Sequence, residues 1–247
     1  MKKQLLFIAL MFTAVYANAQ LMRAEELEKY AKSLYGDKWV DVAENLKNES
    51  ALTLDKNNSM TFIQVVDAPE RTAGQLYTTL NYWFTSTFNN AESTIRLNDK
   101  EAGCIIAQGF VEEIAIHSGG SNKYKVSIRP IIKVDIKDGK CRVTYSIQAY
   151  NVTKIVGGGV LGKIKKAVIN KAEKAVINKS VSGHNEVQYD DQTWPLDQTY
   201  PFAIKDAFNA KKTSAKACIM AYSYSQVIMD KIETAIKEGM VGEDSEW

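Results

Sequence analysis

Residues 157–164 nearly match a phosphate-binding loop, in which glycine backbones surround the phosphates, a lysine reaches them and a Ser or Thr hydroxyl holds Mg²⁺. The segment reads Gly-Gly-Gly-Val-Leu-Gly-Lys-Ile. Ile164 stands where the hydroxyl is required, and the segment follows an antiparallel hairpin instead of the first strand of a parallel sheet. We therefore interpret it as a flexible hinge, and we expect no nucleotide and no other cofactor.

The two histidines, His117 and His184, are the residues most suited to acid–base or metal chemistry. Both lie in Ser/Gly-rich stretches, 67 positions apart, so they form no metal motif. No serine lies in a nucleophile elbow, and Asp190-Asp191 reads as a solvated loop. These observations predict no catalytic residue, no metal site and no enzymatic activity.

The three cysteines, Cys104, Cys141 and Cys218, have no CxxC spacing, so they do not indicate a zinc site. Cys104 and Cys141 fall on strands of one predicted sheet and could form a bridge. Buried free thiols are the interpretation we favour.

Lysines dominate residues 163–179, where Lys-Ala-Val-Ile-Asn-Lys occurs at 166–171 and again at 174–179. The segment could form a basic amphipathic helix that contacts an anionic membrane surface or a protein partner. The alternative is a helix packed on its own domain with a solvated lysine face. The candidate contacts are Lys163, Lys165, Lys166, Lys171 and Lys174.

Residues 1–19 have the pattern of a cleavable signal peptide: a basic start, a short apolar run and Ala17-Asn18-Ala19 before the cleavage point. This predicts export to the periplasm or beyond. Cleavage removes Lys2 and Lys3, so the 31 basic residues fall to 29, against 29 acidic ones. A net charge of zero argues against nucleic-acid binding.

A helix expected over residues 70–88 begins after Asp67-Ala68-Pro69-Glu70 and carries a broad aromatic stripe that includes Trp83 and Phe84. The stripe fits core packing, and it could also line a pocket for a small apolar ligand. Trp83 and Phe84 are the candidate contacts for such a ligand.

Strands are expected over residues 60–66, 94–97, 103–116, 123–137 and 140–150. Gly109 and Pro130 indicate bulges or edge positions. Asp138-Gly139 predicts a two-residue hairpin turn with positive φ at both positions. This turn fixes the register that places Ile136 opposite Cys141, Val134 opposite Val143 and Ile132 opposite Tyr145. The other face of the hairpin is polar and includes Lys125, Arg129, Lys133, Asp135 and Arg142.

Helical periodicity follows Leu27 to Leu34, ending at Gly36, and returns in a long helix opened by Thr213. We expect an α+β fold, an antiparallel sheet with helices packed on one face plus a C-terminal helical region. The predicted organisation is a signal peptide (1–19), an N-terminal helical segment (20–53), an α+β domain (54–151), a Gly/Lys-rich connecting segment (152–200), and a C-terminal helix with an acidic tail (201–247).

Scattered residues of the α+β domain match a known pattern: Leu76-Tyr77 and Trp83, residues 99–103, and residues 137–140 with Arg142 and Tyr145. In order and spacing they resemble a domain-of-unknown-function family of exported Bacteroidetes proteins with a TBP-like fold. The resemblance covers residues 54–151 and implies a curved antiparallel sheet with helices on one side. It implies no activity, cofactor or site residue.

Three functional hypotheses follow. The first is an exported, non-catalytic domain that binds an unknown protein partner or small ligand. The second is a carrier of an apolar ligand held between sheet and helix. The third is an envelope-associated protein that uses residues 163–179.

Overall fold

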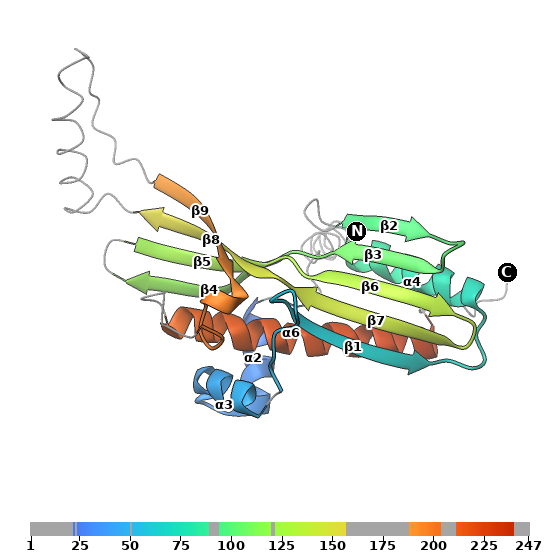
Figure 1. Cartoon of the computed structure of the whole chain (residues 1–247), viewed down its shortest axis with the longest axis horizontal. Helices are drawn as coiled ribbons and strands as arrows, with labels where there is room; N and C mark the ends of the chain where they lie inside the picture. The colour runs from blue at the N-terminus through green and yellow to red at the C-terminus, as the bar shows by residue number, and fades with distance from the viewer. Residues whose placement is uncertain are drawn as a thin grey trace, which may run out of the picture.

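A computed structural model of the chain describes residues 22, 24–49, 51–88, 94–119, 122–156, 188–203 and 211–239. Two antiparallel sheets lie end to end, with helices against one face (Figure 1). This is the α+β architecture expected from the sequence, in which antiparallel strands are covered by helices on one face. The helical elements are α2 (Ala24–Tyr35), η1 (Trp39–Asp41), α3 (Val42–Asn48), α4 (Ala73–Thr87), η2 (Leu196–Gln198) and α6 (Lys211–Glu238).

The five-stranded sheet contains, in spatial order, β1 (Met60–Asp67), β7 (Lys140–Ile147), β6 (Ile131–Lys137), β3 (Cys104–Gln108) and β2 (Thr94–Asp99). The four-stranded sheet contains β4 (Val111–Gly119), β5 (Asn122–Ile128), β8 (Ala149–Val156) and β9 (Gln188–Pro195). Helix α6 runs beneath both sheets, and α4 lies beside it under the five-stranded one (Figure 1).

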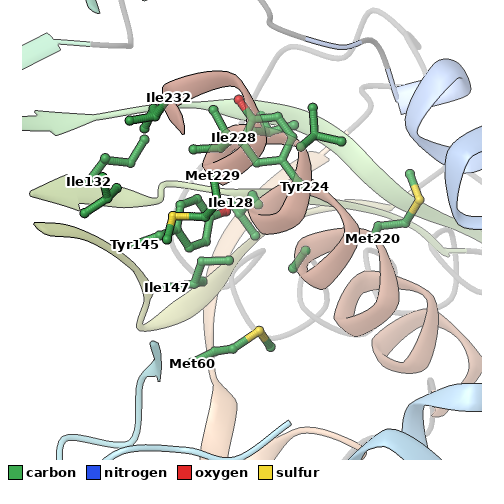
Figure 2. Packing of buried hydrophobic residues seen from close by; sticks show 14 of the residues in the cluster. Met60, Ile128, Ile132, Tyr145, Ile147, Met220, Tyr224, Ile228, Met229 and Ile232 are labelled. Carbon is green, nitrogen blue, oxygen red and sulfur yellow. The ribbon is translucent and has the colours of Figure 1, made fainter. Parts of the chain in front are cut away.

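The core lies between α6 and the sheets. Tyr224, Ile228 and Ile232 on the helix face Ile132 and Tyr145 on the strands (Figure 2). All five side chains are fully buried or nearly so. Their helical spacing on α6 and their alternation on the strands produce the two apolar faces that meet here.

The two sheets are halves of one meander that bends along a line. β3 continues into β4 through Gly109 and Phe110, β5 into β6 through Arg129 and Pro130, and β7 into β8 through Gln148. The long strands predicted for residues 103–116, 123–137 and 140–150 are therefore each divided in two. Gly109 N–H donates to the Pro130 carbonyl across the bend at 2.9 Å. Pro130 itself has no N–H to donate, so the strand breaks there.

The third long strand of the meander, β7–β8, contains one more residue at the bend than its neighbour β5–β6. Ile131 pairs with Ser146 on one side of it, whereas Ile128 pairs with Tyr150 on the other. Between these pairs, two residues of β5–β6 (129 and 130) are matched by three of β7–β8 (147–149), and Gln148 is the extra one. Because one added residue reverses the alternation of faces, Ile147 and Tyr150 both point toward the helices and are buried.

The hairpin of β6 and β7 has the predicted register: Ile136 opposite Cys141, Val134 opposite Val143 and Ile132 opposite Tyr145. Only Gly139 has a positive φ, of 74°, so the expectation of positive φ at both turn residues is wrong for Asp138. The turn is shaped by contacts outside the hairpin. The Gly139 carbonyl accepts from Ala68 N–H at 2.8 Å, and Gly139 N–H donates to the Arg71 carbonyl at 2.9 Å.

Helix α4 begins at Ala73, later than the Asp67–Glu70 start expected from the sequence. Thr72 is the N-cap and forms a capping box with Gln75. The acid near the positive end of the helix dipole is Asp138, whose carboxylate accepts from Ala73 N–H at 2.6 Å. Glu70 does not hold that position because the β6–β7 turn occupies it.

The three cysteines are free and buried, as favoured by the sequence. Cys104 pairs with Asp135 and Cys141 with Ile136, on either side of β6 and on opposite faces. Two strand spacings, about 9–10 Å, exceed the reach of a disulfide. Burial raises the pKa of the Cys218 thiol to about 12, so this thiol remains protonated near neutral pH.

Within the connecting segment expected over residues 152–200, Gln188–Pro195 forms β9 and pairs with β8 along its length. The C-terminal helix begins at Lys211, two residues before Thr213, and packs under the domain. Several sequence predictions lie outside the described residues. They are the predicted signal peptide (1–19), the predicted Gly-rich hinge with His184 and the five candidate lysines in residues 157–187, and the predicted acidic tail after residue 239.

The backbone at Gly103 generates a prediction. It has φ of +60°, and a Cβ there would lie 2.6 Å from the Ile136 carbonyl oxygen. We expect Gly103→Ala to lower the free energy of unfolding by about 2–4 kcal/mol in urea titrations. The control is Gly74→Ala in α4, where the nearest atom would be 3.9 Å away, and where stability should rise by up to about 1 kcal/mol. Equal effects of the two substitutions would contradict this account.

The hydroxyl of Tyr145 generates a second prediction, because it is buried with no hydrogen-bond partner among the described residues. Tyr145→Phe should leave the free energy of unfolding unchanged or raise it by up to about 1 kcal/mol, because a hydroxyl without a partner is costly to bury. The matched control is Tyr200→Phe, which removes a 2.9 Å bond to the Glu44 carboxylate and should lower stability by about 0.5–1.5 kcal/mol. Marked destabilisation by Tyr145→Phe would show that the hydroxyl has a partner.

Candidate functional site

A hollow of about 600 Å³ lies on the face of the four-stranded sheet that the helices leave open. Residues of β4, β5, β8 and β9 line it, together with Phe110 and Arg129 at the bend. We call it the open-face hollow. A cavity of this size fits a small molecule, so this face is the candidate functional site.

Strand alternation explains why the hollow is polar. On β5, Val126 and Ile128 face the helices and are buried, so Lys125 and Ser127 face the other way. Asn151 and Thr153 lie opposite these two residues on β8. The sequence analysis placed Lys125 and Arg129 on the polar face, and both line the hollow.

Glu113 has a left-handed backbone, with φ of +52°. It lies in a bulge between Val111 and Ala115, where the register of β4 against β5 shifts. Its N–H donates to the Ser127 hydroxyl oxygen at 3.2 Å, and its carboxylate accepts from Lys125. That hydrogen bond raises the pKa of the Lys125 ammonium. A left-handed conformation strains a glutamate, and the bulge aims its side chain across the sheet.

Other polar groups of the hollow are also engaged with neighbours. The Arg129 guanidinium lies 4.4 Å from the centre of the Phe110 ring. The Thr153 hydroxyl donates to the Asp191 carboxylate at 2.8 Å. Tyr189, 66% exposed, presents a largely free ring at the end of β9.

The charges of the hollow nearly cancel. Glu112, Glu113 and Asp191 contribute three carboxylates, and Lys125 and Arg129 contribute two cations. Nowhere in the described part of the chain do three His, Cys, Asp or Glu side chains gather as a metal site requires. The arrangement offers hydrogen-bond donors, acceptors and aromatic faces, which are the elements of recognition.

The sequence-predicted ligand contacts, Trp83 and Phe84, lie together in the core under the five-stranded sheet. Phe84 is fully buried and Trp83 is 5% exposed. Their ring centres are 5.1 Å apart in an edge-to-face contact, and Phe88 packs against both. They meet each other, as core packing predicts, and neither lines the open-face hollow.

Two further sequence interpretations concern this region. Asp190 and Asp191, expected in a loop, lie on β9, and Asp191 belongs to the hollow. His117 lies on β4 with its ring centre 6.2 Å from that of Tyr124. Sequence analysis missed the site because β9 is separated from β8 by 31 residues. The available signal for a strand was the presence of Tyr189 and Thr193 on either side of Asp190-Asp191, because both residue types are enriched in strands.

Comparison with known proteins agrees with the fold. Residues 62–151 match the family model described as "Domain of unknown function (DUF4468) with TBP-like fold". The resemblance predicted from the sequence is thereby confirmed, within the boundaries expected for it. The DUF4468 match includes β4, β5 and the start of β8, whereas β9 and α6 lie outside it.

Two solved structures are similar to the chain. One is a DUF4468 family protein from Bacteroides ovatus ATCC 8483, at 15% identity over 75% of this chain and 90% of that one, with a TM-score of 0.43. The other is a TBP-like protein from Parabacteroides distasonis ATCC 8503, at 10% identity over 75% of this chain and 97% of that one, with a TM-score of 0.46. A search of curated proteins finds no match. Within the described residues, no helix combines the length and apolarity needed to cross a membrane.

Strain at Glu113 can be measured. Glu113→Gly should raise the free energy of unfolding by about 0.5–1 kcal/mol, because glycine adopts a left-handed backbone freely. The control is Asn58→Gly, at φ of 58°, which should change stability by less than about 0.5 kcal/mol because asparagine tolerates this region. Urea titration measures both. A loss of stability in Glu113→Gly would mean that the carboxylate outweighs the strain.

Proposed function

We propose that the protein is an exported, non-catalytic binding domain, and that its open-face hollow binds a small, uncharged, hydroxyl-rich molecule such as a sugar. The signal-like residues 1–19 support export. The observation that carries the ligand class is the internal neutralisation of the hollow. The charge, the hydrogen-bonding groups and the aromatic surface of the hollow each support a neutral, hydroxyl-rich ligand.

Charge argues for a neutral ligand. Glu113 is paired with Lys125, and Arg129 lies over Phe110. A strongly anionic ligand would meet three carboxylates, and a strongly cationic one would meet two fixed cations. A neutral ligand avoids both repulsions and leaves the ion pair intact.

Hydrogen bonding argues for hydroxyl groups. Ser127, Thr193 and Asn151 line the hollow, and each carries a donor and an acceptor. A ligand hydroxyl also donates and accepts, so it can satisfy either role at each position. An apolar ligand would desolvate these groups without replacing their bonds to water.

The exposed aromatic surface of the hollow also suits a sugar ring. Tyr189 is 66% exposed, and an exposed ring offers a flat apolar face beside a polar hydroxyl. The C–H face of a sugar ring is apolar while its edge carries the hydroxyls. Stacking on Tyr189 would place those hydroxyls among the polar residues of β8 and β9. The strained backbone of Glu113 is consistent with a binding site, because such strain is commonly found where function requires it.

The test is calorimetric titration with neutral mono- and disaccharides, alongside glucuronic acid and glucosamine as charged counterparts. We expect saturable binding of at least one neutral sugar. Tyr189→Ala and Asp191→Asn should each weaken this binding by about tenfold, equivalent to about 1.4 kcal/mol.

The matched control is Tyr82→Ala, which removes a tyrosine that is 57% exposed on α4, remote from the hollow. It should leave binding unchanged. No binding to any neutral sugar, or equal losses in Tyr82→Ala and Tyr189→Ala, would overturn the proposal.

A further inference from the structure

A second cavity, of about 350 Å³, lies where α2, β1 and α6 meet. Its walls include Tyr30 and Leu34 from α2, Phe62 from β1, and Tyr222, Met229 and Asp230 from α6. It lies on the helical side of the sheet, whereas the open-face hollow lies on the other side. We call it the α2–α6 cleft.

Aromatic rings form much of the cleft. The ring centres of Phe62 and Tyr222 are 5.5 Å apart, with their planes at 46°. Tyr145 supports Phe62 from the core at 6.4 Å. Tyr30 and Asp230 line the same cleft, and burial, followed by the charge of Asp230, raises the pKa of the Tyr30 hydroxyl. The faces of aromatic rings carry partial negative charge, and the Phe62 and Tyr222 rings both line the cleft.

The cleft contains acceptors that lack donors. Gln226 Oε1 is buried and has no hydrogen-bond partner in the described part of the chain. Asp230 is exposed, and no cation among the described residues pairs with it. An oxygen buried without a donor is costly. The cleft therefore combines aromatic faces, one carboxylate and one unsatisfied amide oxygen.

We propose that the α2–α6 cleft binds an organic cation, an alkylated ammonium or a guanidinium group. Such a cation is attracted to aromatic faces and to a carboxylate. An anion would be repelled by Asp230, and an uncharged apolar molecule would gain no electrostatic attraction from that carboxylate. The proposal goes beyond the sugar-binding function and does not depend on it, because the two cavities share no residue.

The test uses choline and its uncharged isostere, 3,3-dimethylbutan-1-ol, which have nearly the same shape. Each is titrated into the full-length protein carrying ¹³C-methyl methionine, and the Met229 methyl resonance reports the cleft. We expect saturable choline binding at least tenfold tighter than binding of the isostere. Asp230→Asn and Tyr222→Leu should each weaken choline binding at least fivefold.

The control is Asp191→Asn, which removes a carboxylate of the open-face hollow and should leave choline binding unchanged. This variant also separates the two proposals, because it weakens sugar binding alone. Thermal melts confirm that each variant folds. Equal affinity for choline and the isostere, unchanged choline affinity in Asp230→Asn, or no shift of the Met229 resonance with choline would each overturn the proposal.

Discussion

Helix α6 packs one apolar stripe against both halves of the sheet, and this burial supports the rest of the molecule. Its 28 residues include Tyr224, Ile228 and Ile232, which face the five-stranded half, and the helix also contacts β4 in the other half (Figures 1 and 2). Full burial of each large apolar side chain contributes about 1.5–3 kcal/mol. Because α6 spans the bend, it fixes the angle between two sheets that would otherwise be joined only by their strands.

The same packing decides which face of the sheet stays open. With the helices on one side, strand alternation sends the polar side chains to the other, where Lys125, Asn151 and Asp191 gather. The bend and the bulge at Glu113 then shape this face into a hollow. A flat sheet would present the same residues without a concave surface. The curvature of the sheet therefore makes this polar face a candidate site.

The two proposed sites differ because their surroundings differ. The open-face hollow is rich in polar groups that satisfy one another, as the Glu113–Lys125 pair shows. The α2–α6 cleft lies beside the apolar core and combines aromatic rings with the exposed Asp230 carboxylate. One of its buried acceptors, Gln226 Oε1, has no hydrogen-bond partner among the described residues. Internal pairing favours a neutral ligand in the first site, and the Asp230 carboxylate beside aromatic rings favours a cation in the second.

The sequence by itself determined the features that depend on near neighbours. The Asp138-Gly139 turn fixes the register of β6 and β7, and helical spacing identifies the buried stripes of α4 and α6. It also placed Lys125 and Arg129 on the polar face. The tertiary structure alone decided the bend, the pairing of β9 with β8, and the meeting of Tyr30, Phe62 and Asp230 in one cleft. These features join residues separated by tens to hundreds of positions, and local periodicity carries no information about which distant surfaces pack together.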